Sequence, residues 1–335
     1  MTALNSVKRP ATRLPGIEML RFIAALCVLL LHVRAVFGGQ QVFGRGYLGV
    51  DFFLMLSGFL MARIQERRLA DGLGQAAFLR ARAWRMWPMM AAAWTIGLPM
   101  QWLRAHGAWD FAWVAMANLA LVPVVGHSFL FPVNIPAWTI LYELGCNTLH
   151  VLALRRVKGA WLALLLVALA GAEVWVCKHY LGVNVGPKPE TALAGVVRCL
   201  FAYVLGISLA RLLAARHGPL LPPGLGWLGW LAVPAMPAIL AGSWALGLRV
   251  WWFDLAFVML ACPLMLLGAL SIARFGRLAG WLGQFAFPVF ALQMPILQGS
   301  QHLGAGYWSG LALALAGGLA GVLLPLGWRR LRAAM

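Results

Sequence analysis

Residues 20–33 read LRFIAALCVLLLHV, and residues 49–58 read GVDFFLMLSG. In the first stretch, ten apolar residues separate Arg21 from His32. An α-helix turns by about 100° per residue, so eleven steps return almost to the same face and place the two side chains about 16 Å apart along the axis. A cation and an imidazole on one stripe of a lipid-compatible helix are costly, and they indicate a functional site inside a membrane.

The composition of the chain also indicates an integral membrane protein. Of its 335 residues, 62% are hydrophobic and only 11% are charged, which is too little polar surface for a soluble protein of this length. Apolar stretches run to about 20 residues without the alternation of a β-barrel strand. We therefore expect an all-α membrane protein, a polytopic bundle of about ten transmembrane helices.

The formal net charge of +18 could suggest nucleic-acid binding. The cations, however, lie at the ends of apolar segments, which is the pattern that sets membrane topology, and we expect no nucleic-acid partner. The five cysteines lie singly inside apolar runs, so we expect them to pack in the core rather than to form a metal site.

Eleven apolar segments are candidate crossings. If all eleven crossed from a cytoplasmic N-terminus, the loop with Arg155, Arg156 and Lys158 would lie outside, against the positive-inside rule. We therefore expect 111–135 to be a re-entrant or interfacial segment and both termini to be cytoplasmic. The expected single domain, 1–335, then has ten crossing helices, near 17–37, 47–64, 84–104, 136–154, 160–178, 191–213, 225–247, 250–270, 281–299 and 306–327.

Three ionisable residues lie at similar depth in this predicted topology, namely His32, Asp51 and Glu143. A neutral imidazole can take a proton from a hydroxyl, and a carboxylate can orient it and stabilise the imidazolium. Each residue also has a structural alternative: His32 could form a hydrogen bond between helices, Asp51 could pair with Arg34, and Glu143 could have a structural partner.

Arg80, Arg82 and Arg85 stand in the segment FLRARAWRMWP on the predicted cytoplasmic side. Arg82 and Arg85 share one helix face. Guanidinium groups suit phosphates, so the segment is a candidate phosphate site. Topogenic charge and binding of lipid head groups are the alternative.

Arg198 lies too deep in its helix to be topogenic and needs an internal anion, which could be Glu143, Asp51 or a ligand. No two histidines have the spacing of a helical metal site, and we expect no metal. The histidines at loops or helix ends are expected to be solvated: His106, His127, His150, His179, His217 and His302.

These stretches together resemble the acyltransferase-3 family of bacterial membrane O-acyltransferases, which decorate polysaccharides and other cell-envelope glycoconjugates. The resemblance spans most of the chain in the expected order. It rests on 14–33, 47–64, 78–88, 135–144 and, more weakly, 198–206.

The family's Arg-x10-His motif corresponds to Arg21 and His32, and its Arg-x-x-Arg motif to Arg82 and Arg85. Its Phe-Phe-x-x-Ser-Gly motif corresponds to 53–58, with Leu54 in place of the second Phe. Its Trp-x4-Glu signature corresponds to Trp138 and Glu143. In a late helix, Gln293 stands where the family often has His, which departs from the pattern.

The resemblance implies about ten transmembrane helices in the bacterial cytoplasmic (inner) membrane and transfer of an acyl group, most often acetyl, from cytoplasmic acyl-CoA to a hydroxyl of an envelope saccharide or glycolipid. It implies acyl-CoA as co-substrate without a permanently bound cofactor, and polysaccharide-assembly proteins as possible partners. The implied catalytic residues are His32 as general base, Glu143 and Asp51. The CoA phosphates would be held by Arg80, Arg82 and Arg85. The residues that would shape the site are Arg21, Ser57, Arg198 and Trp138.

Two other functions remain open from the sequence. A glycoconjugate or small-anion transporter or flippase would use buried charges as a substrate or proton path, although no inverted repeat is visible. A catalytically silent subunit of a polysaccharide assembly machine would retain the fold without turnover. A covalent acyl-histidine also stays open beside direct transfer.

Overall fold

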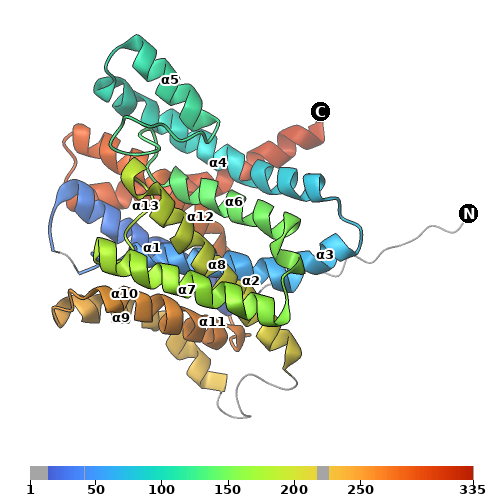
Figure 1. The fold of residues 1–335 in the computed structure, drawn as a ribbon. Coiled ribbons are helices and arrows are strands. Elements are labelled where there is room, and N and C mark those ends of the chain that lie inside the picture. The colour runs from blue at the N-terminus through green and yellow to red at the C-terminus, as the bar shows by residue number, and fades with distance from the viewer. Residues whose placement is uncertain (1–13, 41, 217–225, 335) are drawn as a thin grey trace, which may run out of the picture.

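The structure, a computed structural model, describes residues 14–40, 42–216 and 226–334. Beyond residue 323 it describes the backbone and not the side chains. The described residues form helices and connecting turns and contain no strand (Figure 1). The helices are α1 Pro15–Phe37, α2 Leu48–Leu60, α3 Glu66–Ala70, α4 Gln75–Arg104, α5 Ala108–Leu119, α6 Ala137–Leu152, α7 Gly159–Tyr180, α8 Ala192–Ala215, α9 Ala232–Ala245, α10 Trp251–Ala256, α11 Cys262–Leu270, α12 Gly276–His302 and α13 Tyr307–Ala334.

Seven helical stretches among the described residues are long and apolar enough to cross a membrane. They are 15–37, 48–70, 159–180, 189–215, 226–245, 251–270 and 276–302. These stretches fit a multi-pass membrane protein. The predicted count of ten additionally requires α4, α6 and α13. Of these, α6 has only 16 residues, and the side chains of α13 are described only as far as residue 323.

Two of the crossing stretches contain a turn of π-helix. Residues 61–65 join α2 to α3, and residues 257–261 join α10 to α11. A π-helical turn keeps the chain helical while it shifts the faces on either side, so each pair still acts as one crossing segment.

The segment predicted not to cross forms α5 and an irregular stretch. In Figure 1, α5 lies at the edge of the bundle, beyond the end of α4. Residues 120–136 form turns and bends. They are tied back by Asn118, whose Oδ1 accepts the Val133 N–H at 3.2 Å.

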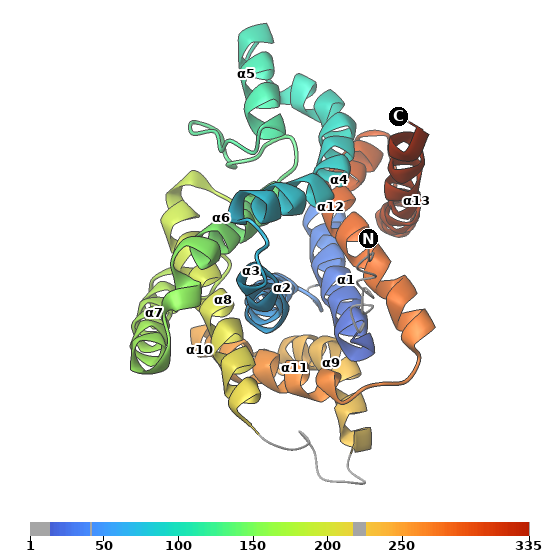
Figure 2. The same ribbon diagram turned by 90° about the vertical axis from the view of Figure 1, so that its right-hand side faces the viewer.

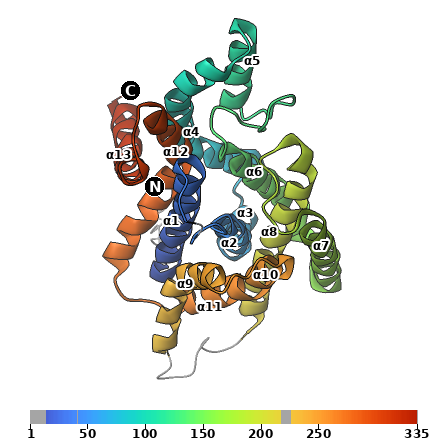
Figure 3. The ribbon, with the colours of Figure 1, turned by 90° about the vertical axis from the view of Figure 1, so that its left-hand side faces the viewer.

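Helix α2 runs through the middle of the bundle. Figures 2 and 3 show it surrounded by α1, α6, α8 and the α9–α11 region. Two glycines let α2 and α8 approach closely: a Cβ on Gly58 would lie 2.0 Å from the Tyr203 carbonyl oxygen, and one on Gly206 would lie 1.9 Å from that of Met55. This central helix carries both Asp51 and Ser57.

Helices α1 and α12 pack side by side and run in the same direction. Near their starts, the Glu18 carboxylate lies against Gly283, and near their ends Gln301 donates a hydrogen bond to the Val36 carbonyl. Two helices that run in the same direction have an odd number of crossings between them, and the predicted topology places seven crossings between these two.

The five cysteines are free and buried, which confirms the prediction that they pack in the core. Of the N-terminal part predicted to be cytoplasmic, residues 1–13 lie outside the described residues, as does His217.

Candidate active site

Three side chains from three helices meet in the interior of the bundle. The guanidinium Nη2 of Arg82 in α4 lies 2.5 Å from Oε1 of Glu143 in α6, and it donates to the Ser57 hydroxyl in α2 at 2.8 Å. The Ser57 hydroxyl in turn donates to the same Glu143 oxygen at 2.9 Å. The side chains of Arg82 and Glu143 are 13% and 21% exposed, so the cluster is partly buried rather than sealed.

More charge surrounds this cluster. The guanidinium of Arg85 interacts electrostatically with Arg82, Glu143, Arg21 and Glu18. Arg21 forms an ion pair with Glu18 at 3.1 Å, one turn earlier in α1. The structure therefore brings together Arg21, Arg82 and Arg85, with an excess of positive charge over the two carboxylates.

Arg80 does not point the same way as Arg82, although both lie in α4. The side chains of Arg80 and Arg85 are both exposed, but Arg80 is not among the groups that act on Arg85. A helix turns by about 200° over two residues, so Arg80 and Arg82 point in different directions.

His32 lies further along α1, on the face that packs against α12. The imidazole interacts with the Gln293 side chain, and its Nδ1 is shielded from solvent without a hydrogen bond. Among the described residues no hydrogen bond joins it to Glu143, which instead takes Arg82 and Ser57 as partners. The partnership of Glu143 with His32 that the sequence suggested is therefore absent from these contacts.

Asp51 and Arg198 form a buried ion pair with two parallel hydrogen bonds. Arg198 Nε donates to Asp51 Oδ1 at 2.8 Å, and Nη2 donates to Oδ2 at 2.7 Å. Their side chains are 0% and 1% exposed. Of the three anions considered for Arg198, the structure selects Asp51, and this pair holds α2 against α8. Asp51 thus has Arg198 rather than Arg34 as its partner.

The same guanidinium is fixed from two more sides. It donates to the carbonyls of Tyr47 and Val185 at 2.8 and 3.1 Å, and it lies 5.7 Å from the ring centre of Trp138. The indole of Trp138 also packs against Gly186, where a Cβ would lie 2.4 Å away. Trp138 therefore shapes the wall beside the Asp51–Arg198 pair.

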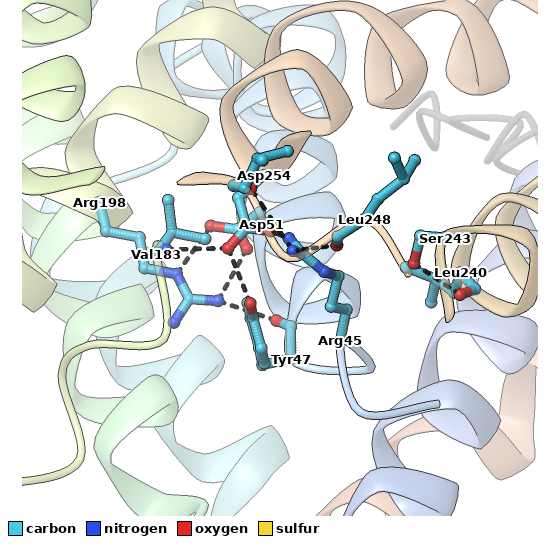
Figure 4. Close-up of polar contacts among 10 residues, drawn as sticks. Arg45, Tyr47, Asp51, Val183, Arg198, Leu240, Ser243, Leu248 and Asp254 are labelled. Carbon is cyan, nitrogen blue, oxygen red and sulfur yellow. Dashed lines mark hydrogen bonds and ion pairs between the residues drawn. The ribbon is translucent and has the colours of Figure 1, made fainter. Parts of the chain in front are cut away.

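Asp254 joins this cluster from α10, as Figure 4 shows. It pairs with Arg45, accepts the Tyr47 hydroxyl at 2.7 Å and accepts the Val183 N–H at 3.0 Å. The loops that hold Arg45 and Val183 are thereby fastened to α10. Sequence reasoning did not single out Asp254; a lone carboxylate in an apolar segment was the available signal.

A second polar cluster, also missed, lies around His150. Its Nε2 is 3.0 Å from Glu66 Oε1, and Arg211 Nη2 donates to the same oxygen at 2.8 Å. The His150 side chain is 0% exposed, so the expectation that it is solvated is wrong: the helix end on which it stands is covered by α3 and α8. Glu66 stands in the polar run QERR at 65–68, so the sequence carried no signal of a buried partner.

Glu173 in α7 is a third residue that sequence reasoning passed over. It is fully buried, and both carboxylate oxygens lack a hydrogen-bond partner among the described residues. No group of three or more His, Cys, Asp or Glu side chains in the described ranges is arranged to hold a metal ion.

The fold and the site define a class of protein: a multi-pass helical membrane protein with a cationic cluster and a separate imidazole inside the bundle. A model of the acyltransferase-3 family, described as an acyltransferase domain, matches residues 14–327. The chain belongs to this family of membrane acyltransferases. It is also similar to "Protein 2 in picA locus" of Rhizobium radiobacter, with 28% identity over 160 residues, which covers 42% of this chain and 82% of the relative. No solved structure matches the chain.

Proposed function

We propose that this chain is an O-acyltransferase of the bacterial inner membrane, with both termini cytoplasmic, that moves an acetyl group from cytoplasmic acetyl-CoA to a hydroxyl of a cell-envelope saccharide. The observation that carries the proposal is the contact of Arg82 with Glu143 and Ser57, because it joins three distant segments into one cationic site in a chain of the acyltransferase-3 family.

The cationic cluster suits the phosphate groups of the donor. Guanidinium groups form paired hydrogen bonds with phosphate oxygens, and Glu143 and Ser57 hold Arg82 in one orientation before the ligand arrives. Arg85 and Arg21 add positive charge from the same region. Arg80, which is exposed, would meet the donor at its entrance.

His32 is the general base of the proposed reaction. It stands about 16 Å along α1 from Arg21, so a donor anchored by the cationic cluster would extend its thioester toward the imidazole. A half-buried imidazole without a charged partner can take a proton from a hydroxyl. The Asp51–Arg198 pair and Trp138 then form the wall that keeps α2 and α8 in place.

His32 removes the proton from the acceptor hydroxyl while the hydroxyl oxygen attacks the thioester carbonyl. The new C–O ester bond forms, the C–S bond breaks, and the departing thiolate takes the proton from the imidazolium. The products are an O-acyl saccharide and free CoA.

The test is release of CoA by the purified full-length protein in nanodiscs, followed with a thiol reagent. Acetyl-CoA is supplied with and without an envelope saccharide fraction, beside a protein-free control. We expect release that rises when the saccharide is added. If folded protein releases no CoA with any acyl-CoA, the proposal fails, and transport or a silent assembly role becomes the better account.

A further inference from the structure

The imidazole of His32 and the amide of Gln293 meet across the interface of α1 and α12. The two contacts that fix the register of these helices, Glu18 with Gly283 and Val36 with Gln301, each join residues 265 positions apart. This register places Gln293 one helical turn before His32. Because the two helices run in the same direction, both side chains lean toward the same end, and the interaction between them spans this turn.

The Gln293 side chain is fully buried, and one half of its amide is already bound. Its Nε2 donates to the carbonyl of Phe290 at 3.1 Å. The acceptor half, Oε1, is shielded from solvent and has no hydrogen bond of ordinary length. The amide is therefore held with its oxygen available, and the imidazole is the polar group within reach.

Carboxylates in α1, α2 and α10 are already paired with arginines, and Arg34, two residues after His32 in α1, adds a cation whose Nε has no hydrogen-bond partner among the described residues. Glu18 pairs with Arg21, Asp51 with Arg198 and Asp254 with Arg45. The part of the chain that the structure describes thus offers His32 an amide and no carboxylate.

We propose that Gln293 is the positioning residue of His32: its Oε1 accepts the N–H of the imidazole, orients the ring and leaves the second ring nitrogen free to take the proton of the acceptor hydroxyl. Hydrogen bonds of this kind are often long without substrate and shorten when the reacting complex forms. A neutral partner also leaves the imidazolium without a counter-ion, so it returns its proton readily to the departing thiolate. This inference rests on the proposed role of His32.

The first experiment compares Gln293→Met and Gln293→Glu with the wild type. Methionine keeps the length of the side chain and removes the amide, and we expect kcat to fall at least about tenfold, as for the loss of one buried hydrogen bond. KM for acetyl-CoA should stay within about twofold, because the donor binds elsewhere. Gln284→Met is the matched control, since Gln284 also donates to a carbonyl of α12, that of Gly280, away from the imidazole.

The second variant gives a signature that a packing role would not produce. Gln293→Glu places a carboxylate beside the imidazole and stabilises its protonated form. The acidic limb of the kcat profile should therefore move to higher pH by about one unit or more. An unchanged limb together with wild-type kcat in Gln293→Met would overturn the proposal.

If a variant is inactive, the protonation of His32 can still be compared by a measurement that does not depend on turnover. Diethyl pyrocarbonate modifies neutral imidazole, and the modification of the His32 peptide can be followed by mass spectrometry over a pH series. Gln293→Glu should shift the midpoint upward, and Gln284→Met should not. The His32→Ala variant separates the two proposals. If His32→Ala keeps full activity, His32 is not the base, whatever the Gln293 variants do. If His32→Ala is inactive but Gln293→Met has wild-type activity, only the inference about Gln293 is rejected.

Discussion

Arg82 and Glu143 lie 2.5 Å apart although 61 residues separate them in the chain. Their contact joins α4 to α6, and the Ser57 hydroxyl joins both to α2. A half-buried guanidinium that is fixed on one edge keeps its remaining donors for a ligand. This relationship underlies the first prediction.

Replacing Glu143 by Gln should raise KM for acetyl-CoA more than it lowers kcat. The amide cannot hold Arg82 as firmly, so we expect KM for acetyl-CoA to rise about tenfold, in line with the loss of a hydrogen bond to a charged group. Steady-state kinetics over a range of acetyl-CoA concentrations measure this. Glu190→Gln, in an exposed pair with Lys188, is the control, and equal effects of both variants would contradict the assignment.

Arg85 and Arg80 should differ although they stand on one helix. Both side chains are exposed, but Arg85 interacts electrostatically with Arg82 and Glu143, and Arg80 is not among the groups that act on it. We expect Arg85→Ala to raise KM for acetyl-CoA several-fold and to reduce its dependence on salt, because one screened attraction is lost. Arg80→Ala should have the smaller effect. The reverse order would show that the phosphates bind elsewhere on α4.

The Asp51–Arg198 pair should determine stability. Both groups are fully buried, and a partner left alone keeps an uncompensated charge, so Asp51→Asn should lower the free energy of unfolding by about 3–5 kcal/mol. Thermal unfolding in one detergent measures the change. The control is Asp71→Asn on the exposed turn after α3. A normal melting temperature for Asp51→Asn would mean that the pair is dispensable for the fold.

The contact of α2 with α8 should not tolerate a methyl group. Gly206→Ala would place a Cβ 1.9 Å from the Met55 carbonyl oxygen, which the backbone can relieve only by moving. We expect loss of folded protein, measured by monodisperse yield on size-exclusion chromatography. Gly145→Ala has open space around it and should express normally; similar yields for both variants would argue against the close approach.

The sequence predicted the helices better than the contacts between them. The predicted span 47–64 corresponds to α2 and the π-helical turn after it, and 281–299 lies inside α12. Hydropathy predicts where a helix runs, but the hydropathy of the sequence does not change at a π-helical turn. The turns at 61–65 and 257–261 therefore leave no mark that a hydropathy pattern could reveal.

The sequence predicted individual residues of the site, but not which of them contact each other. The need of Arg198 for an internal anion followed from its depth, and Asp51 was among the candidates. The choice of Arg82 as the partner of Glu143 depends on how α2, α4 and α6 are rotated against each other, which the spacing of residues does not determine. His150 was misjudged for the same reason, because its burial comes from Glu66 and Arg211 on other helices.

The central claim is that His32 removes the proton of the acceptor hydroxyl. It is tested most directly by mass spectrometry of an envelope saccharide fraction after incubation with acetyl-CoA and reconstituted protein, with His32→Ala beside the wild type and His302→Ala, an exposed histidine, as the control. We predict acetylated saccharide from the wild type and His302→Ala and none above background from folded His32→Ala. Equal acetylation by His32→Ala would contradict the account.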